Sequence, residues 1–183
     1  WEELMVAGRV TVLDLGDTAN RTVSNLMIAH FLRNLRRVQE DRYQDARKHG
    51  GFLVPVEIFL EESHESLAGS KAQRMEIVLS QMRELILRGR KRKLGICLIT
   101  QYPQQMPREM LDSMHSAILH EITGEETIRG LKHSVTTILE SQWRAIGSLA
   151  QGSALVAFPG QLKMPVVVDV FPCCFRIITP LGN

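Results

Sequence analysis

The sequence predicts an α/β fold built on a largely parallel sheet, and three observations support this prediction. Apolar residues dominate over 53–60, which predicts a strand buried on both faces, and residues 94–100 form a second apolar stretch of strand length. Between them, apolar residues recur at helical spacing over 75–86. Strands that alternate with helices favour parallel pairing with right-handed crossover connections.

Four stretches are expected to be neighbouring parallel strands of this sheet. They are residues 10–15, 53–60, 94–100 and 117–122. Toward the end of the chain, β-rich residues 153–158 and 164–170 are joined by Pro159 and Gly160, a pair typical of turns. The sequence therefore adds a C-terminal hairpin to the parallel sheet.

The expected helices lie between these strands. Apolar spacing predicts a helix over 22–38, and the polar residues 39–51 are expected to form its tail and a loop. Ser70 to Gln73 has the pattern of a capping box for the helix that ends at Arg88 and Gly89. A second capping-box pattern, over 123–126, predicts the start of a short helix.

Length and composition place the chain among ordinary globular proteins. Its 183 residues form one domain or a large part of one, and the net charge of +2 gives no whole-chain field that would indicate nucleic acid. No apolar run has the length of a membrane span, and the start of the chain lacks a signal-peptide pattern. The three cysteines, Cys97 and the adjacent Cys173 and Cys174, have no disulfide or metal spacing. We therefore expect a cytoplasmic protein without a membrane partner, and the initial Trp1 suggests a piece of a longer chain.

Acidic or amide side chains stand at the ends of three expected strands. Asp14 ends the first, Glu61 and Glu62 follow the second, and Gln101 follows the third. In an open parallel sheet these carboxyl ends lie together at the ligand-binding edge. Nucleotide hydrolysis requires one carboxylate for the Mg²⁺ shell, a second for the attacking water, and benefits from an amide near the phosphate. These residues therefore predict half of a hydrolytic site.

The other half of such a site is missing from the sequence. No Gly-x-x-x-x-Gly-Lys-Ser/Thr pattern occurs in the chain, so nothing in it can cradle the β- and γ-phosphates of a nucleotide. On its own, the chain is expected to bind nucleotide weakly or not at all.

The chain carries four motifs, at residues 8–15, 61–64, 88–103 and 146–156, and together they resemble, in the same order, those of the HerA branch of the HerA/FtsK superfamily of hexameric DNA-pumping ATPases. The first, over 8–15, matches a Gly-x-Val-Thr-Val-x-Asp-Leu strand, and the second is Glu-Glu-Ser-His at 61–64. The third runs from Arg88 to Pro103 and is similar to the family's Glu-Gly-Arg-Lys and Gln-Arg-Pro segment. The last, over 146–156, resembles a late Leu-x-x-Gly-x-Ala strand. In this family the phosphate loop lies upstream of the first motif.

The resemblance implies a fold and a set of site residues. The fold would be RecA-like, of the P-loop NTPase type, with residues 1–183 forming the C-terminal part of one ATPase domain. Glu61 and Glu62 would be the Walker B acids, Glu61 holding Mg²⁺ through water and Glu62 polarising the attacking water. Gln101 would be the sensor of the γ-phosphate, and Arg90 a finger that reaches the nucleotide of the neighbouring subunit.

Two positions stay open within the resemblance. Tyr102 stands where the family often has arginine, so any role that the arginine side chain has in the family is open here. His64 also matches a family position, but its chemistry alone does not assign it a role. Residues 88–93 are also compatible with a solvated, basic helix end.

The implied activity is ATP-driven translocation of double-stranded DNA by a homo-hexamer that uses ATP and Mg²⁺. It would act with a nuclease or another effector protein in DNA end processing or anti-phage defence. One alternative is a conjugation- or secretion-type ATPase that moves protein or single-stranded DNA. A second is a RecA-like interaction module that does not hydrolyse ATP.

Overall fold

The computed structural model describes residues 1–16, 18, 20–67 and 76–172. The chain divides into two compact units, Trp1–Met110 and Leu111–Asn183. Together their elements form a mixed α/β fold with a parallel strand pair flanked by helices, which confirms the predicted fold class. In the described part of the chain, no helix has the length and hydropathy needed to cross a membrane.

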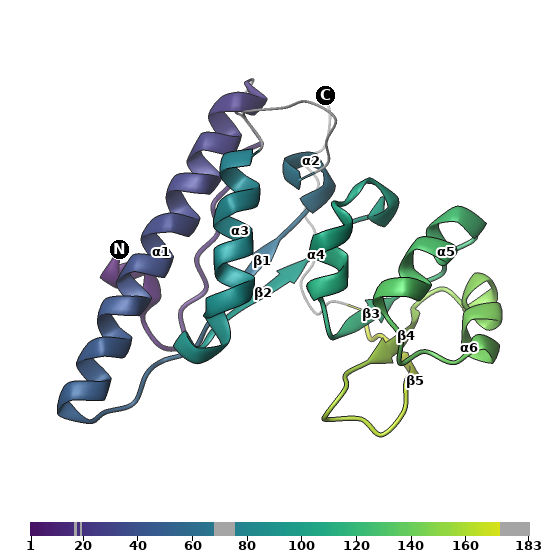
Figure 1. Cartoon of the computed structure of the whole chain (residues 1–183). Helices are drawn as coiled ribbons and strands as arrows, with labels where there is room; N and C mark the ends of the chain where they lie inside the picture. Colours follow the sequence, from purple (N-terminus) through teal and green to yellow (C-terminus); the bar gives the residue numbers. More distant parts are fainter. Residues whose placement is uncertain (17, 19, 68–75, 173–183) are drawn as a thin grey trace. The chain divides into compact units, whose positions relative to one another are not determined.

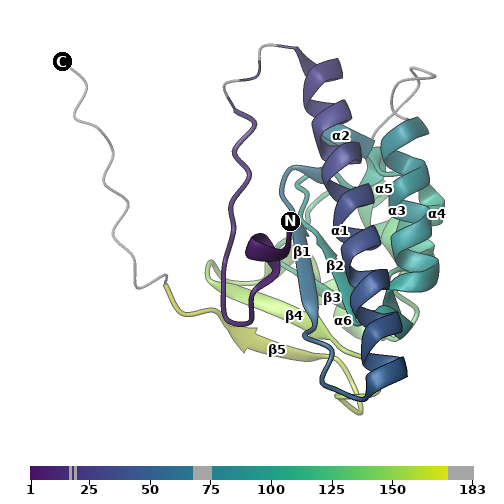
Figure 2. The ribbon, with the colours of Figure 1, turned by 90° about the vertical axis from the view of Figure 1, so that its left-hand side faces the viewer.

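The first unit is built on two parallel strands, β1 (Val56–Leu60) and β2 (Leu94–Leu98). Helices α1 (Arg21–His49) and α3 (Glu76–Arg88) pack against each other and cover one face of the strand pair (Figures 1 and 2). The parallel pairing of these two predicted strands is therefore confirmed. The short elements of this unit are η1 (Glu2–Met5), α2 (Ser63–Leu67), η2 (Gly89–Arg92), η3 (Pro103–Gln105) and α4 (Arg108–Ser113), which crosses the division between the units.

Helix α1 is longer than the sequence predicts. It begins at the cap residue Asn20, whose side-chain oxygen accepts a hydrogen bond of 2.9 Å from the amide of Thr22. It then continues through the polar segment that the sequence predicts to be a helix tail and a loop, and stops before Gly50, where φ is 70°. The capping-box residues expected before α3, 70–73, lie outside the described residues, as do Cys173 and Cys174.

The reason for the longer helix is a polar residue in the core. Gln39 is fully buried, and its amide nitrogen donates to the carbonyl oxygens of Val54, at 2.9 Å, and Arg92, at 2.8 Å. These two carbonyls lie just before β1 and β2, so Gln39 ties the second half of α1 to the start of both strands. The buried Oε1 of Gln39 accepts no hydrogen bond from the described residues, so it is the two bonds from the amide nitrogen that hold the helix in place although Gln39 breaks the apolar pattern.

The other face of the strand pair is exposed, contrary to the prediction that both faces are buried. Along β1, Glu57 and Phe59 point to this open face, and Phe59 is 67% exposed. Among the described residues, α1 and α3 cover only the opposite face. β1 is apolar except for Glu57, so Phe59 is a large apolar side chain on a side of the strand that has no cover among the described residues.

The strand predicted over residues 10–15 does not form. These residues belong to no strand or helix, and Val10 and Val12 are 88% and 83% exposed. Strand structure requires a neighbour for its backbone hydrogen bonds, and no segment in the described ranges pairs with this one. The β-rich composition of residues 10–15 indicates that this stretch can form a strand, but it does not identify a second strand for it to pair with.

The second unit contains an antiparallel sheet in the order β3 (Ala117–Leu119), β4 (Ser153–Ala157) and β5 (Val166–Asp169). The predicted C-terminal hairpin is confirmed, with φ of 88° at Gly160 in its turn. The prediction that residues 117–122 pair in parallel with the other strands is wrong. β3 lies in the second unit and pairs with β4 of the same unit, which runs in the opposite direction after the connection that contains α5 and α6.

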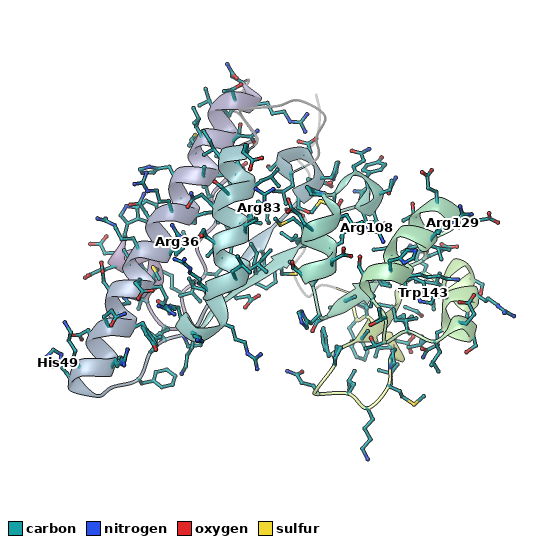
Figure 3. The ribbon with its side chains drawn as sticks, viewed as in Figure 1. Arg36, His49, Arg83, Arg108, Arg129 and Trp143 are labelled. Atoms are coloured by element: carbon teal, nitrogen blue, oxygen red, sulfur yellow. The ribbon has the colours of Figure 1, made fainter. Side chains whose placement is uncertain are left out.

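Helices α5 (Glu125–Ser134) and α6 (Glu140–Ala145), followed by η4 (Ile146–Ser148), belong to the same unit. Trp143, labelled in Figure 3, is 3% exposed and anchors a core that also contains Leu131, Val135, Ile138, Ile146, Leu155 and Ala157. The capping box predicted over 123–126 does not form. Helix α5 begins after Gly124, which contributes no side-chain cap.

Candidate functional site

The segments that follow β1 and β2 lie side by side because the two strands are parallel and in register. Leu60 pairs with Leu98, and the amide of Ile99 donates to the carbonyl oxygen of Leu60 at 2.9 Å. Beyond the strands, both the amide and the hydroxyl of the fully buried Ser63 donate to the carbonyl oxygen of Ile99, at 2.9 and 3.0 Å. Residues 61–64 are therefore fixed beside residues 99–102 at one edge of the sheet.

Glu62 and Gln101 meet at this edge, as the sequence predicts. The amide nitrogen of Gln101 donates to Oε1 of Glu62 at 3.1 Å. Glu62 has a φ of 45°, in the left-handed region that residues other than glycine seldom adopt. Such backbone strain persists where surrounding contacts enforce it, and it is concentrated at functional sites. The catalytic roles of the two residues stay predictions.

His64 and Thr100 join the same cluster, although the sequence alone assigns no role to His64 and does not distinguish Thr100. Nδ1 of His64 lies 3.1 Å from the hydroxyl of Thr100 and 3.3 Å from Oε2 of Glu62. The only sequence signal for this contact was the position of the two residues after paired strands. It becomes visible once the strand register is known.

Glu61 points to solvent directly before Glu62. Within the described ranges, no three His, Cys, Asp or Glu residues gather closely enough to surround a metal ion. Magnesium does not require such a cage, because it keeps several waters and takes one or two carboxylates together with substrate phosphates. A single accessible carboxylate at a strand end fits that pattern, so Glu61 is suited to hold Mg²⁺ through water when phosphates are present.

Asp14, the third acid predicted for this edge, belongs to the unpaired segment instead. Its Oδ1 accepts a hydrogen bond of 2.9 Å from the amide of Gly16 in a local turn. It therefore does not end a strand in this structure.

Arg90 lies at the opposite end of β2 from Gln101. It is exposed in η2, directly before the strand, whereas Gln101 follows the strand. The five residues of β2 alone span about 13 Å at about 3.3 Å per step. Arg90 is therefore too far away to act on the Glu62 site of its own chain, and its predicted role in a neighbouring subunit stays a prediction.

A cavity of about 610 Å³ lies between α1, α3 and η2, lined by neither Glu62 nor Gln101. Ion pairs cross it: Arg36, labelled in Figure 3, contacts Glu84 at 2.7 Å, and Arg92 contacts Glu40 at 2.6 Å. The hydrogen bond from Arg92 is the main reason why the pKa of Glu40 is lowered. Arg36 thus fastens α1 to α3, and Arg92 fastens η2 to α1.

Comparison with solved structures identifies the class of fold. Over 79% of this chain and 62% of the other, the fold is similar to the genome packaging NTPase B204 of Sulfolobus turreted icosahedral virus 2 in complex with AMPPCP, with a TM-score of 0.56 and 12% identity. The same NTPase in complex with ATP-γS gives a TM-score of 0.54 over 76% of this chain, at 11% identity. The chain therefore has the fold of a P-loop packaging ATPase, without the phosphate loop itself.

Sequence comparison then supports the particular resemblance. The DNA double-strand break repair helicase HerA of Saccharolobus solfataricus is 22% identical over 169 residues, which is 92% of this chain and 32% of the relative. A probable helicase of Methanocaldococcus jannaschii is 23% identical over 86% of this chain and 29% of its own length. No family model matches. The chain spans about a third of the curated relatives, and these matches confirm its resemblance to the HerA/FtsK superfamily.

Proposed function

We propose that this chain is the hydrolytic part of an ATP-driven motor that translocates double-stranded DNA. The observation that carries the proposal is the contact between Gln101 and Glu62 at the carboxyl edge of two parallel strands. A carboxylate held by an amide at this edge is suited to orient a water molecule for attack on a phosphate. The resemblance to HerA and to packaging NTPases supports DNA as the cargo.

In this proposal the residues of the chain act on water and on charge. Glu62 accepts a hydrogen bond from the attacking water and draws its proton, while Gln101 fixes the orientation of the carboxylate. Glu61 holds Mg²⁺ through water, and the bound metal ion supplies charge neutralisation for the phosphates. A phosphate loop from outside these 183 residues completes the nucleotide site.

The proposed assembly is a homo-hexamer in which Arg90 of one subunit reaches the nucleotide of the next. Its position at the far end of β2 supports this arrangement, because the residue is exposed and distant from Glu62 of its own chain. A ring of subunits that grips the phosphate backbone binds DNA without sequence preference and in a salt-sensitive way. A nuclease or another effector is the proposed partner in DNA end processing or defence.

The test is ATP hydrolysis and strand displacement by protein that includes the phosphate loop. Hydrolysis should rise with linear double-stranded DNA, and the protein should displace a third strand from a DNA triplex in an ATP-dependent way. Stimulation by single-stranded DNA or unfolded protein alone would favour a conjugation- or secretion-type motor. If the protein binds ATP but does not hydrolyse it with double-stranded DNA, single-stranded DNA or unfolded protein, it is a non-catalytic module and the proposal is overturned.

A further inference from the structure

His64 is the member of the Glu61–His64 motif to which the proposed mechanism gives no task. It occupies the first turn of α2, and its side chain is 12% exposed. The imidazole lies between Glu62, which follows β1, and Thr100, which follows β2. Because the side chain is nearly buried beside a carboxylate, its ring nitrogens are expected to have hydrogen-bond partners.

One ring nitrogen faces two oxygen atoms. Nδ1 makes a hydrogen bond with the hydroxyl of Thr100 at 3.1 Å and lies 3.3 Å from Oε2 of Glu62. A bare Nδ1 would direct its lone pair at the carboxylate with no hydrogen between them, which is repulsive. A proton on Nδ1 can be shared between both oxygens, so the Nδ1–H form is the one that the arrangement favours.

The ring itself is held in place from the β2 side. The hydroxyl of Thr100 also accepts a hydrogen bond of 3.0 Å from the amide of Tyr102, which fixes its position. The Tyr102 ring meets the imidazole at a centroid distance of 4.9 Å and an angle of 68°, a stable edge-to-face geometry. Next to His64, Ser63 is anchored on the carbonyl of Ile99. These contacts therefore fix the position of the imidazole beside the half-exposed carboxylate of Glu62.

We propose that His64 is a positioning residue for Glu62. Its Nδ1–H holds Oε2 of the carboxylate while Gln101 holds Oε1, so each oxygen has a partner from a different side. Thr100 anchors the imidazole, which links the carboxylate to the segment that carries Gln101. The inference rests on the proposed function for its kinetic consequence, but the hydrogen-bond arrangement itself can be tested without ATP.

The need for such support follows from the backbone of Glu62. With φ of 45°, this residue is held in a backbone conformation that residues other than glycine seldom adopt, and its side chain is 46% exposed. A free carboxylate in that position would sample several rotamers. Contacts to both oxygens restrict it to one, which is the preorganisation that a water-orienting group requires.

The first experiment determines the tautomer of His64 by NMR of nitrogen-15-labelled imidazoles in the nucleotide-free protein. The signal is assigned by its loss in His64→Asn. We expect a proton on Nδ1, with a signal that shifts in both Glu62→Gln and Thr100→Val. A neutral ring protonated only at Nε2, or a signal unaffected by either variant, would overturn the inference whatever the protein does with ATP.

The second experiment compares three substitutions by their effect on turnover and on nucleotide affinity. Asparagine places an amide close to the position of Nδ1, glutamine places it further out near Nε2, and alanine removes it. We expect His64→Ala and His64→Gln to lower turnover about 10- to 100-fold, the usual loss when an orienting group is removed. His64→Asn should keep most activity, and ATP affinity should stay unchanged in all three.

A merely structural role would give a different pattern. It would lower affinity and turnover together and would not separate asparagine from glutamine, and either result overturns the inference. In a Glu62→Gln background, His64→Ala should cause little further loss, because the carboxylate that it positions is gone. An equal loss in both backgrounds also contradicts the proposal. Absence of ATP hydrolysis in the wild type would instead refute the proposed function, while the tautomer measurement would still decide on His64.

Discussion

The amide of Gln101 donates to the carboxylate of Glu62 across 3.1 Å and joins the segments that follow two parallel strands. Gln101 stands three positions after the end of β2, and Glu62 stands two positions after the end of β1. Their meeting depends on the parallel direction of the strands, since antiparallel pairing would place the two ends at opposite edges of the sheet.

Substitution of Gln101 by alanine should lower turnover without loss of nucleotide binding. The variant removes the donor that holds Oε1 of Glu62, so the carboxylate becomes less well oriented. We expect about a 10- to 100-fold loss in the complete protein, smaller than for Glu62 itself because water can replace the amide in part. Gln105→Ala, at an exposed glutamine of η3, is the matched control and should leave turnover unchanged. Equal effects of the two variants would contradict the role of Gln101.

Substitution of Arg90 by alanine should abolish hydrolysis in the assembled ring while each subunit still binds nucleotide. A finger supplied in trans contributes about 10³–10⁵ in rate to phosphoryl transfer. Lys91→Ala, at the adjacent exposed cation, tests whether charge alone matters and should have little effect.

Mixing of defective subunits separates action in trans from action in cis. Arg90→Ala subunits combined with Glu62→Gln subunits should regain partial activity, because some interfaces then contain both intact residues. If mixed rings form and hydrolyse nothing, titration with wild-type subunits shows whether the ring requires every site at once. Normal hydrolysis by Arg90→Ala alone would remove this residue from the site.

Glu57 should make folding stability depend on pH. Burial raises the pKa of its carboxyl, which lies against Gly95 of the paired strand. As pH rises, the unfolded chain therefore loses this proton first, and the free energy of unfolding falls between the usual glutamate pKa and the raised one. Glu57→Gln should remove this decline and unfold at a higher urea concentration at neutral pH.

The pKa of the Cys97 thiol tests the charge of Glu57 in a second, independent way. Burial, and after it the charge of Glu57, raises the pKa of the Cys97 thiol. In Glu57→Gln the thiol pKa should fall toward its usual value, measured as the pH dependence of Cys97 alkylation followed by mass spectrometry. Urea and alkylation curves that match those of the wild type would contradict the partial desolvation of the Glu57 carboxyl against Gly95.

Gly89 should not tolerate a side chain. A Cβ at this position would lie 2.7 Å from the carbonyl oxygen of Leu94, a backbone atom that cannot move without disturbing β2. We expect Gly89→Ala to cost about 1–3 kcal/mol in the free energy of unfolding. Gly130→Ala is the matched control, because no atom outside its own helix turn lies within 4 Å of its Cβ position in α5. It should stabilise the protein by about 1 kcal/mol, and equal effects in denaturant unfolding would refute the argument.

The sequence predicts the β1–β2 edge well because its signals are local. An apolar run followed by Glu61 and Glu62, and another followed by Gln101, are each visible within a few residues, and parallel pairing brings them together. Such signals do not specify partners. Residues 10–15 have strand composition but no paired neighbour among the described segments, and the direction of β3 follows from β4, which lies more than 30 residues later.

Two further features depend on contacts that no local pattern contains. Because Gln39 is polar, the sequence pattern predicts that the helix core ends before it. Its hydrogen bonds to two carbonyls distant in the sequence nevertheless hold it in the core. His64 and Thr100 are 36 residues apart, and their contact follows only from the register of β1 and β2.

The central claim, that Glu62 activates water for ATP hydrolysis, is tested most directly by single-turnover hydrolysis in Glu62→Gln, with ATP affinity measured in parallel. The protein must include the phosphate loop, and Glu65→Gln, at an exposed acid of α2 three residues after Glu62, is the matched control. We expect unchanged ATP affinity and a rate about 10²–10⁴-fold lower than that of the wild type, because glutamine keeps the shape but not the charge. A rate equal to that of the wild type, or the same loss in Glu65→Gln, would contradict the account.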